Sequence, residues 1–115
     1  MRVLVIGAGR VGAKVLLQLK KNPNLTLLTV DPREAPYAVE EGIIQSVDYN
    51  SELTSGDLAP VLEAVKPDMV IVTTSREDMG RSGVPGLGIL VEALQGELEA
   101  TSKVPIIAVD RTSVA

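Results

Sequence analysis

Three glycines with the spacing Gly-x-Gly-x-x-Gly follow the apolar run 3–6 and precede a segment with helical periodicity. Gly7 would permit a tight turn, Gly9 would let backbone N–H groups approach an anion, and Gly12 would let a helix pack closely on a sheet. A helix that begins there offers unpaired N–H donors and a partial positive charge. This pattern is typical of a diphosphate-binding turn. Its candidate residues are Gly7, Ala8, Gly9, Arg10, Val11 and Gly12.

An acidic residue ends the next predicted strand, roughly 20 residues beyond the last glycine, which is the spacing expected of a dinucleotide-binding unit. The carboxylate of Asp31 could accept hydrogen bonds from the ribose hydroxyls of adenosine. We therefore expect a bound dinucleotide. Two other interpretations stay open: a glycine bend without ligand, in which Asp31 is a solvated turn residue before Pro32, and a flavin or another adenosine-bearing ligand.

The residues around Asp31 also bear on the choice between NAD and NADP. A carboxylate beside the ribose would repel the 2′-phosphate of NADP, so Asp31 favours NAD. Arg33, two residues after it and next to Pro32, could instead hold that phosphate, stack on the adenine, or lie exposed without a partner. NAD is the predicted cofactor, and NADP is the alternative.

Apolar strands alternate with amphipathic helices along the chain. Strands are expected at 3–6, 25–30, 43–47, 69–72 and 104–109, and helices from the glycine turn to about 21, at 35–41, at 58–65 and at 87–98. This alternation predicts one α/β domain over residues 1–115, a doubly wound parallel sheet of about five strands in the order 3-2-1-4-5 with helices on both faces.

The polar stretch 73–88 is predicted to be a loop, and its first residues directly follow the predicted strand 69–72. Because ligands in such sheets bind beyond the carboxyl ends of the strands, the hydroxyls of Thr73, Thr74 and Ser75 could bind ribose or phosphate, or could only cap the loop.

Composition excludes several classes of function. The chain has no cysteine and no histidine, which removes thiolate and imidazole ligands, disulfides and the commonest general base. We predict no metal site and assign no catalytic residue. A net charge of −4 and only two tyrosines leave neither a basic face nor a stacking platform for nucleic acid. The apolar runs are too short to cross a membrane, and no secretory signal is visible, so we expect a cytoplasmic protein.

The sequence Gly7 to Gly12, together with Asp31, resembles the N-terminal halves of Rossmann proteins. The compact five-strand length looks most like the stand-alone NAD-binding domains of the KTN or RCK type (TrkA-N-like), which regulate potassium channels and transporters. In that family a Gly-Asp pair closes the third strand and contacts the adenosine side. Val47-Asp48 stands at the comparable place here, so the resemblance implies Asp48 as a further cofactor contact.

Two functions follow as expectations. The first is an NAD(H)-binding module that senses the dinucleotide, as a homo-oligomer or as a subunit of a larger assembly, because little chain follows the fifth strand to bring a substrate to the nicotinamide. The second is an oxidoreductase completed by a partner chain or by a C-terminal domain. The Tyr-x-x-x-Lys pair of short-chain dehydrogenases does not occur, since Glu41 follows Tyr37 and Leu53 follows Tyr49. A scaffold that keeps the turn for another partner is a third possibility.

Overall fold

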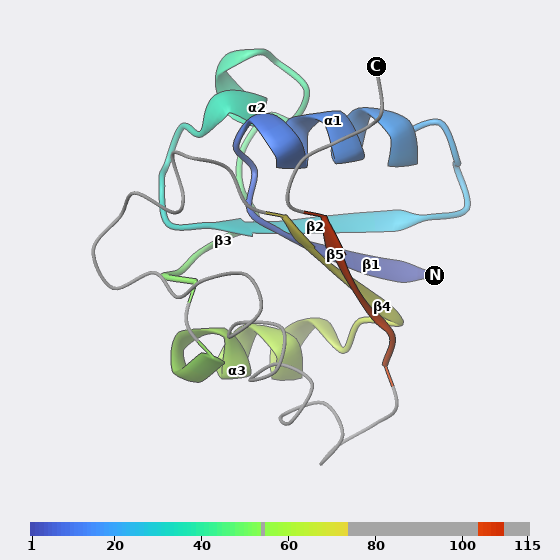
Figure 1. Cartoon of the computed structure of the whole chain (residues 1–115), viewed down its shortest axis with the longest axis vertical. Coiled ribbons are helices and arrows are strands. Elements are labelled where there is room, and N and C mark those ends of the chain that lie inside the picture. Colours follow the sequence, from blue (N-terminus) through green and yellow to red (C-terminus); the bar gives the residue numbers. More distant parts are fainter. Residues whose placement is uncertain (54, 74–103, 110–115) are drawn as a thin grey trace.

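The fold is a parallel sheet with helices on both faces (Figure 1). The structure is a computed structural model that describes residues 1–53, 55–73 and 104–109. Its strands and helices, in chain order, are β1 (Arg2–Ile6), α1 (Arg10–Leu19), β2 (Thr26–Asp31), α2 (Tyr37–Glu40), β3 (Tyr49–Asn50), α3 (Ser55–Val65), β4 (Met69–Thr73) and β5 (Ile106–Val109). The predicted helix at 87–98 lies outside the described residues.

The sheet has the strand order β3-β2-β1-β4-β5, and every pairing is parallel. This confirms the predicted doubly wound order. Because β2 and β3 lie on one side of β1 while β4 and β5 lie on the other, the direction of winding changes between β1 and β4. In such folds the crevice at this switch point, beyond the carboxyl ends of the strands, is where ligands bind.

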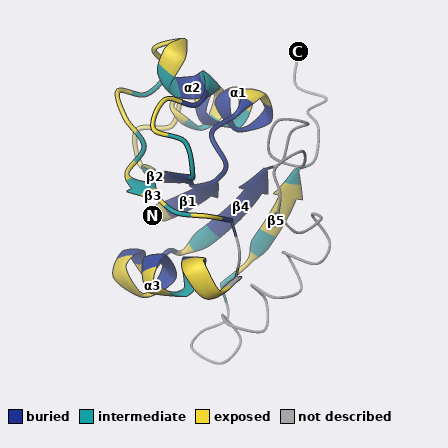
Figure 2. Cartoon of the chain, turned by 90° about the vertical axis from the view of Figure 1, so that its left-hand side faces the viewer, coloured by how far each residue is buried: buried dark blue, intermediate teal, exposed yellow. Residues whose placement is uncertain are grey.

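Alternate side chains of β1 enter two separate cores, which explains why the whole run 3–6 is apolar. Leu4 and Ile6 belong to the core under α3, whereas Val3 and Val5 belong to the core under α1 and α2. Figure 2 shows the buried central strands between these two helical layers. A strand covered on both faces needs apolar residues at every position. The glycine turn therefore begins at the end of a strand that is buried on both faces.

The predicted third strand at 43–47 is wrong. The N–H groups of Ile43 and Ile44 both donate to the carbonyl of Ala38, so the chain curls back on the end of α2 instead of extending beside β2. Gly42, with φ +74°, makes the reversal possible, because glycine adopts this left-handed conformation without strain. The two isoleucines pack against the core under α1. The strand that pairs with β2 comes later, at Tyr49–Asn50.

Candidate functional site

The glycine turn is packed so tightly that two of its glycines cannot carry a side chain. Gly7 has φ +97°, and a Cβ there would lie 2.6 Å from Oγ1 and 2.7 Å from the carbonyl oxygen of Thr73. A Cβ on Gly12 would lie 2.8 Å from the carbonyl carbon of Gly7 and closer still to its oxygen. Real Cβ atoms do not approach backbone to less than 3.0 Å. These glycines are therefore required by the chain's own packing, as the sequence predicted for a tight turn and a close helix.

Gly9 differs from the other two glycines. It is the N-cap of α1 with φ −77° and ψ −155°, an extended conformation that any residue adopts. Its backbone angles therefore do not require glycine. Among residues 1–53, 55–73 and 104–109, no side chain caps this end of α1 by a hydrogen bond. Since N-terminal N–H groups of a helix need acceptors, this end can accept an anion from outside the chain.

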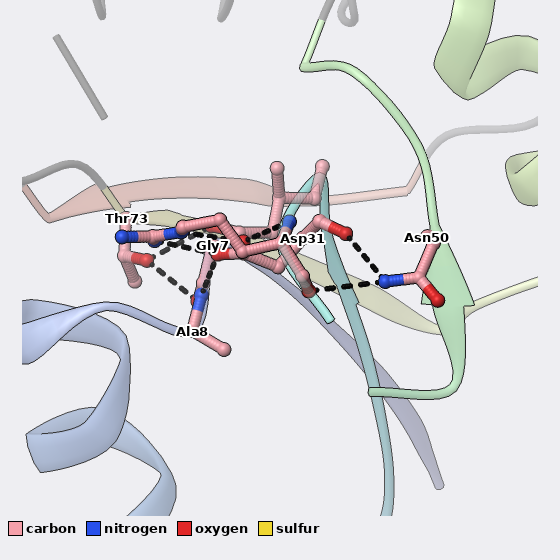
Figure 3. Close-up of polar contacts among 7 residues, drawn as sticks. Gly7, Ala8, Asp31, Asn50 and Thr73 are labelled. Carbon is pink, nitrogen blue, oxygen red and sulfur yellow. Dashed lines mark hydrogen bonds and ion pairs between the residues drawn. The ribbon is translucent and has the colours of Figure 1, made fainter. Parts of the chain in front are cut away.

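Thr73 closes the turn from the neighbouring strand. Its hydroxyl lies at the end of β4, is 1% exposed, and lies 2.9 Å from the carbonyl oxygen of Ile6 and 3.0 Å from that of Gly7. In this arrangement the hydroxyl hydrogen-bonds to the glycine turn, and its predicted contact with ribose or phosphate stays a prediction. Figure 3 shows Thr73 beside Gly7 and Ala8. Thr74 and Ser75 lie outside the described residues.

Asp31 lies at the mouth of the turn, at the carboxyl end of β2, and is fully buried. Its Oδ2 accepts a hydrogen bond from the backbone N–H of Ala8 at 2.8 Å, so the carboxylate is joined directly to the glycine segment. The interpretation of Asp31 as a solvated turn residue is therefore wrong. Pro32 follows it, half-buried, at the position where the chain leaves the strand.

Arg33 folds back over the same carboxylate. Its Nε and backbone N–H each lie 2.9 Å from Oδ1 of Asp31, and its Nη2 lies 2.9 Å from Oδ2. The interpretation of Arg33 as an exposed cation without a partner is therefore wrong. Planar pairs of this kind, in which two N–H groups meet two oxygens, are among the strongest charge-assisted contacts in proteins.

The carboxyl end of β3 contributes a residue that the sequence analysis missed. The Asn50 side-chain Nδ2 donates to the carbonyl oxygen of Asp31 at 3.3 Å and to that of Arg33 at 3.0 Å (Figure 3). The N–H of Ser51 also donates to the Asp31 carbonyl, at 3.3 Å. Asn50 thus holds the segment that carries Asp31 and Arg33. A correct placement of the third strand would have indicated it.

Asp48 precedes β3 instead of following the third strand. Its Oδ2 accepts hydrogen bonds from the N–H of Thr29 at 2.8 Å and from the Thr29 hydroxyl at 3.1 Å. Asp48 therefore lies beside the middle of β2. Its carboxylate accepts the hydrogen bond that a backbone carbonyl would accept if β3, which has only two residues, were longer. Its predicted contact with adenosine stays a prediction.

The first turn of α1 places Arg10 and Val11 differently. Val11 is buried, at 9% exposure, and helps hold the helix on the protein. Arg10 is exposed, and its guanidinium carbon lies 4.6 Å from the ring centroid of Tyr37 at the start of α2. From there a half-open groove of about 440 Å³ runs along α1, and its lining residues are Arg10, Ala13, Lys14, Leu17, Tyr37, Glu41 and Ile43.

The part of the chain that the structure describes contains neither a metal-binding cluster nor a membrane-spanning helix. Within residues 1–53, 55–73 and 104–109, no cluster of three or more acidic, cysteine or histidine side chains could hold a metal ion. Among the helices of the same residues, none has the length and apolar character that crossing a membrane demands.

Comparison with known proteins supports the fold. No protein-family model and no curated protein sequence matches the chain. Similar solved structures include the glycinamide-RNase-transformylase T of Mycobacterium tuberculosis, with a TM-score of 0.61, 15% identity and coverage of 94% of this chain and 28% of that one. The N5-carboxyaminoimidazole ribonucleotide synthetase of Thermotoga maritima follows with a TM-score of 0.55, 17% identity and coverage of 91% and 24%.

A third similar structure is the UDP-glucuronic acid 4-epimerase of Bacillus cereus in complex with NAD. It has a TM-score of 0.57 and 19% identity, and the match covers 94% of this chain and 39% of the epimerase. The chain thus spans well under half the length of each of these proteins. At such identities the likeness concerns the fold, which is a Rossmann-like α/β fold.

Proposed function

We propose that this chain is an NAD(H)-binding module with a sensing or regulatory role. The observation that carries the proposal is Gly9, the N-cap of α1, whose backbone angles permit any residue. In the described part of the chain, no side chain caps this helix end by a hydrogen bond. Absence of a side chain at this position is what a diphosphate needs to reach the N–H groups of α1. The buried carboxylate of Asp31 accepts a hydrogen bond from the N–H of Ala8, and this closeness to the glycine turn supports a role in binding the adenosine ribose.

The chemistry of the chain favours a binding role over catalysis. Hydride transfer to or from a carbonyl compound usually needs a group that moves a proton, and the chain offers neither histidine nor cysteine. The carboxylate nearest the turn, that of Asp31, already forms an ion pair with Arg33. The epimerase similar in fold is an NAD complex, which supports the choice of cofactor.

Isothermal titration calorimetry with NAD, NADH, NADP and FAD tests the proposal. We expect binding of NAD and NADH, and at least about a tenfold loss of affinity in Gly9→Ala, because the added methyl group would block the approach of the diphosphate to the helix N-terminus. The urea midpoint of this variant should stay close to that of the wild type, because the backbone angles of Gly9 suit alanine.

Gly56→Ala is the matched control. It adds the same methyl group on α3, where nothing lies within 4 Å of the new Cβ. It should leave the affinity for NAD unchanged. Absence of binding by all four nucleotides, or equal binding by Gly9→Ala, would contradict the proposal. Turnover of NADH with small carbonyl compounds would instead indicate the oxidoreductase alternative.

A further inference from the structure

The carboxylate of Asp31 is already saturated by donors from the chain itself. Ala8 supplies one N–H to Oδ2, and Arg33 supplies Nη2 to Oδ2 and both Nε and its backbone N–H to Oδ1, all at 2.8 to 2.9 Å. An ionised carboxylate offers about four lone-pair positions to donors. Two ribose hydroxyls can therefore hydrogen-bond to Asp31 only after some of these donors have left.

Of these donors, only the guanidinium can leave without unfolding the turn. The N–H groups of Ala8 and Arg33 belong to the backbone, whereas the guanidinium is carried by a flexible side chain that is 20% exposed. The carboxylate itself is 0% exposed. The Arg33 side chain is thus the more exposed member of the pair, and rotation about its side-chain bonds would move the guanidinium away from the carboxylate.

We propose that Arg33 is an internal competitor of the adenosine ribose, a side chain that occupies Asp31 and must be displaced when NAD binds. This inference rests on the proposed function. It assigns Arg33 a role in setting the affinity for nucleotides with a free 2′-hydroxyl. Arg33 thereby stabilises the free protein at the expense of ligand affinity, so its removal should change stability and binding in opposite directions.

Calorimetry on Arg33→Met is the test, with NAD and with its 2′-deoxyadenosine analogue as ligands. We expect the variant to bind NAD about tenfold more tightly than the wild type, since no ion pair has to be broken. Its preference for NAD over the 2′-deoxy analogue should widen, because the hydroxyl now has direct access to the carboxylate. Its urea midpoint should fall. If Arg33 had a structural role alone, Arg33→Met would lower stability without raising the affinity for NAD.

Lys21→Met is the control for the loss of one positive charge, because Lys21 is exposed and its Nζ donates to Oε1 of Gln18 at 3.4 Å. It should bind NAD like the wild type. If Arg33→Met does not fold, Arg33→Lys makes the same comparison: an ammonium keeps the charge but cannot form the planar pair, so a smaller gain in affinity is expected.

Two results would overturn the inference while leaving the proposed function intact. One is NAD affinity that is unchanged or weaker in Arg33→Met and Arg33→Lys. The other is a loss of NADP affinity with no change for NAD, which would make Arg33 a receptor for the 2′-phosphate. If neither wild type nor variants bind NAD, both the proposed function and this inference fail.

Discussion

Gly12→Ala is expected to lower the free energy of unfolding by about 3 kcal/mol and to abolish binding of NAD. The added Cβ would lie 2.8 Å from the carbonyl carbon of Gly7 and 3.1 Å from Oγ1 of Thr73, so it would meet backbone that cannot move without opening the turn. Either α1 shifts away from the sheet or the turn loses its φ of +97° at Gly7. Urea unfolding followed by circular dichroism measures the first effect, and calorimetry measures the second.

The matched comparison is Gly56→Ala, whose new Cβ lies in open space at the start of α3. Alanine is a better helix former than glycine, so this variant should be as stable as the wild type or about 0.5 kcal/mol more stable. A Gly12→Ala protein as stable as Gly56→Ala would show that α1 does not pack on the glycine turn in this way.

Asp31→Asn should lower the free energy of unfolding by about 3 kcal/mol, because it leaves a partly buried guanidinium without its charge partner. An amide offers one oxygen where the carboxylate offered two, so the N–H of Ala8 and the donors of Arg33 compete for it. Binding of NAD should weaken as well, since one ribose hydroxyl loses its acceptor. Urea unfolding and calorimetry give the two values.

Asp68→Asn is the control for Asp31→Asn. Asp68 is exposed and accepts a hydrogen bond from the N–H of Arg2 at 2.8 Å, at the amino ends of β1 and β4 and far from the turn. Its loss of stability should stay below about 1 kcal/mol. The double variant Asp31→Asn/Arg33→Met should recover part of the loss, because it removes both partners together. No recovery would contradict the ion pair as the cause.

The sheet and its order could be predicted because the signals are strong and local. The apolar run of β1, the glycines after it and the next apolar run ending at Asp31 correspond to one strand, one turn and one strand in the structure. The unbroken apolar run 3–6 within β1 also indicates cover on both faces, which the two cores confirm.

The prediction of a third strand at 43–47 was wrong because apolar residues occur both in strands and in buried segments that pair with no strand. Ile43 and Ile44 are half-buried under α1, but their N–H groups bond to Ala38 and not to a neighbouring strand. A sequence does not show which carbonyl an N–H will meet. Tyr49 and Asn50, which do pair with β2, are a strand of two residues and form no visible pattern.

The ion pair of Asp31 with Arg33 also could not be predicted from the sequence. Asp31 and Arg33 are two residues apart, and the backbone N–H of Arg33 donates to Oδ1 of Asp31, a local turn that brings the two side chains together. Hydrogen bonds from Asn50, on another strand, hold the backbone of this segment. The pair therefore depends on a tertiary contact, which explains why the position of Asp31 could be predicted while its partner could not.

In the proposed complex, backbone N–H groups at the start of α1 bind the diphosphate of NAD. Its most direct test is a titration of the ¹⁵N-labelled protein with NAD, followed by the amide signals in NMR spectra. We predict that the largest shifts fall on the amides of residues 8–12 and that they are lost in Gly9→Ala. Amides that do not move, or shifts concentrated instead along the groove at Leu17 and Ile43, would contradict the claim.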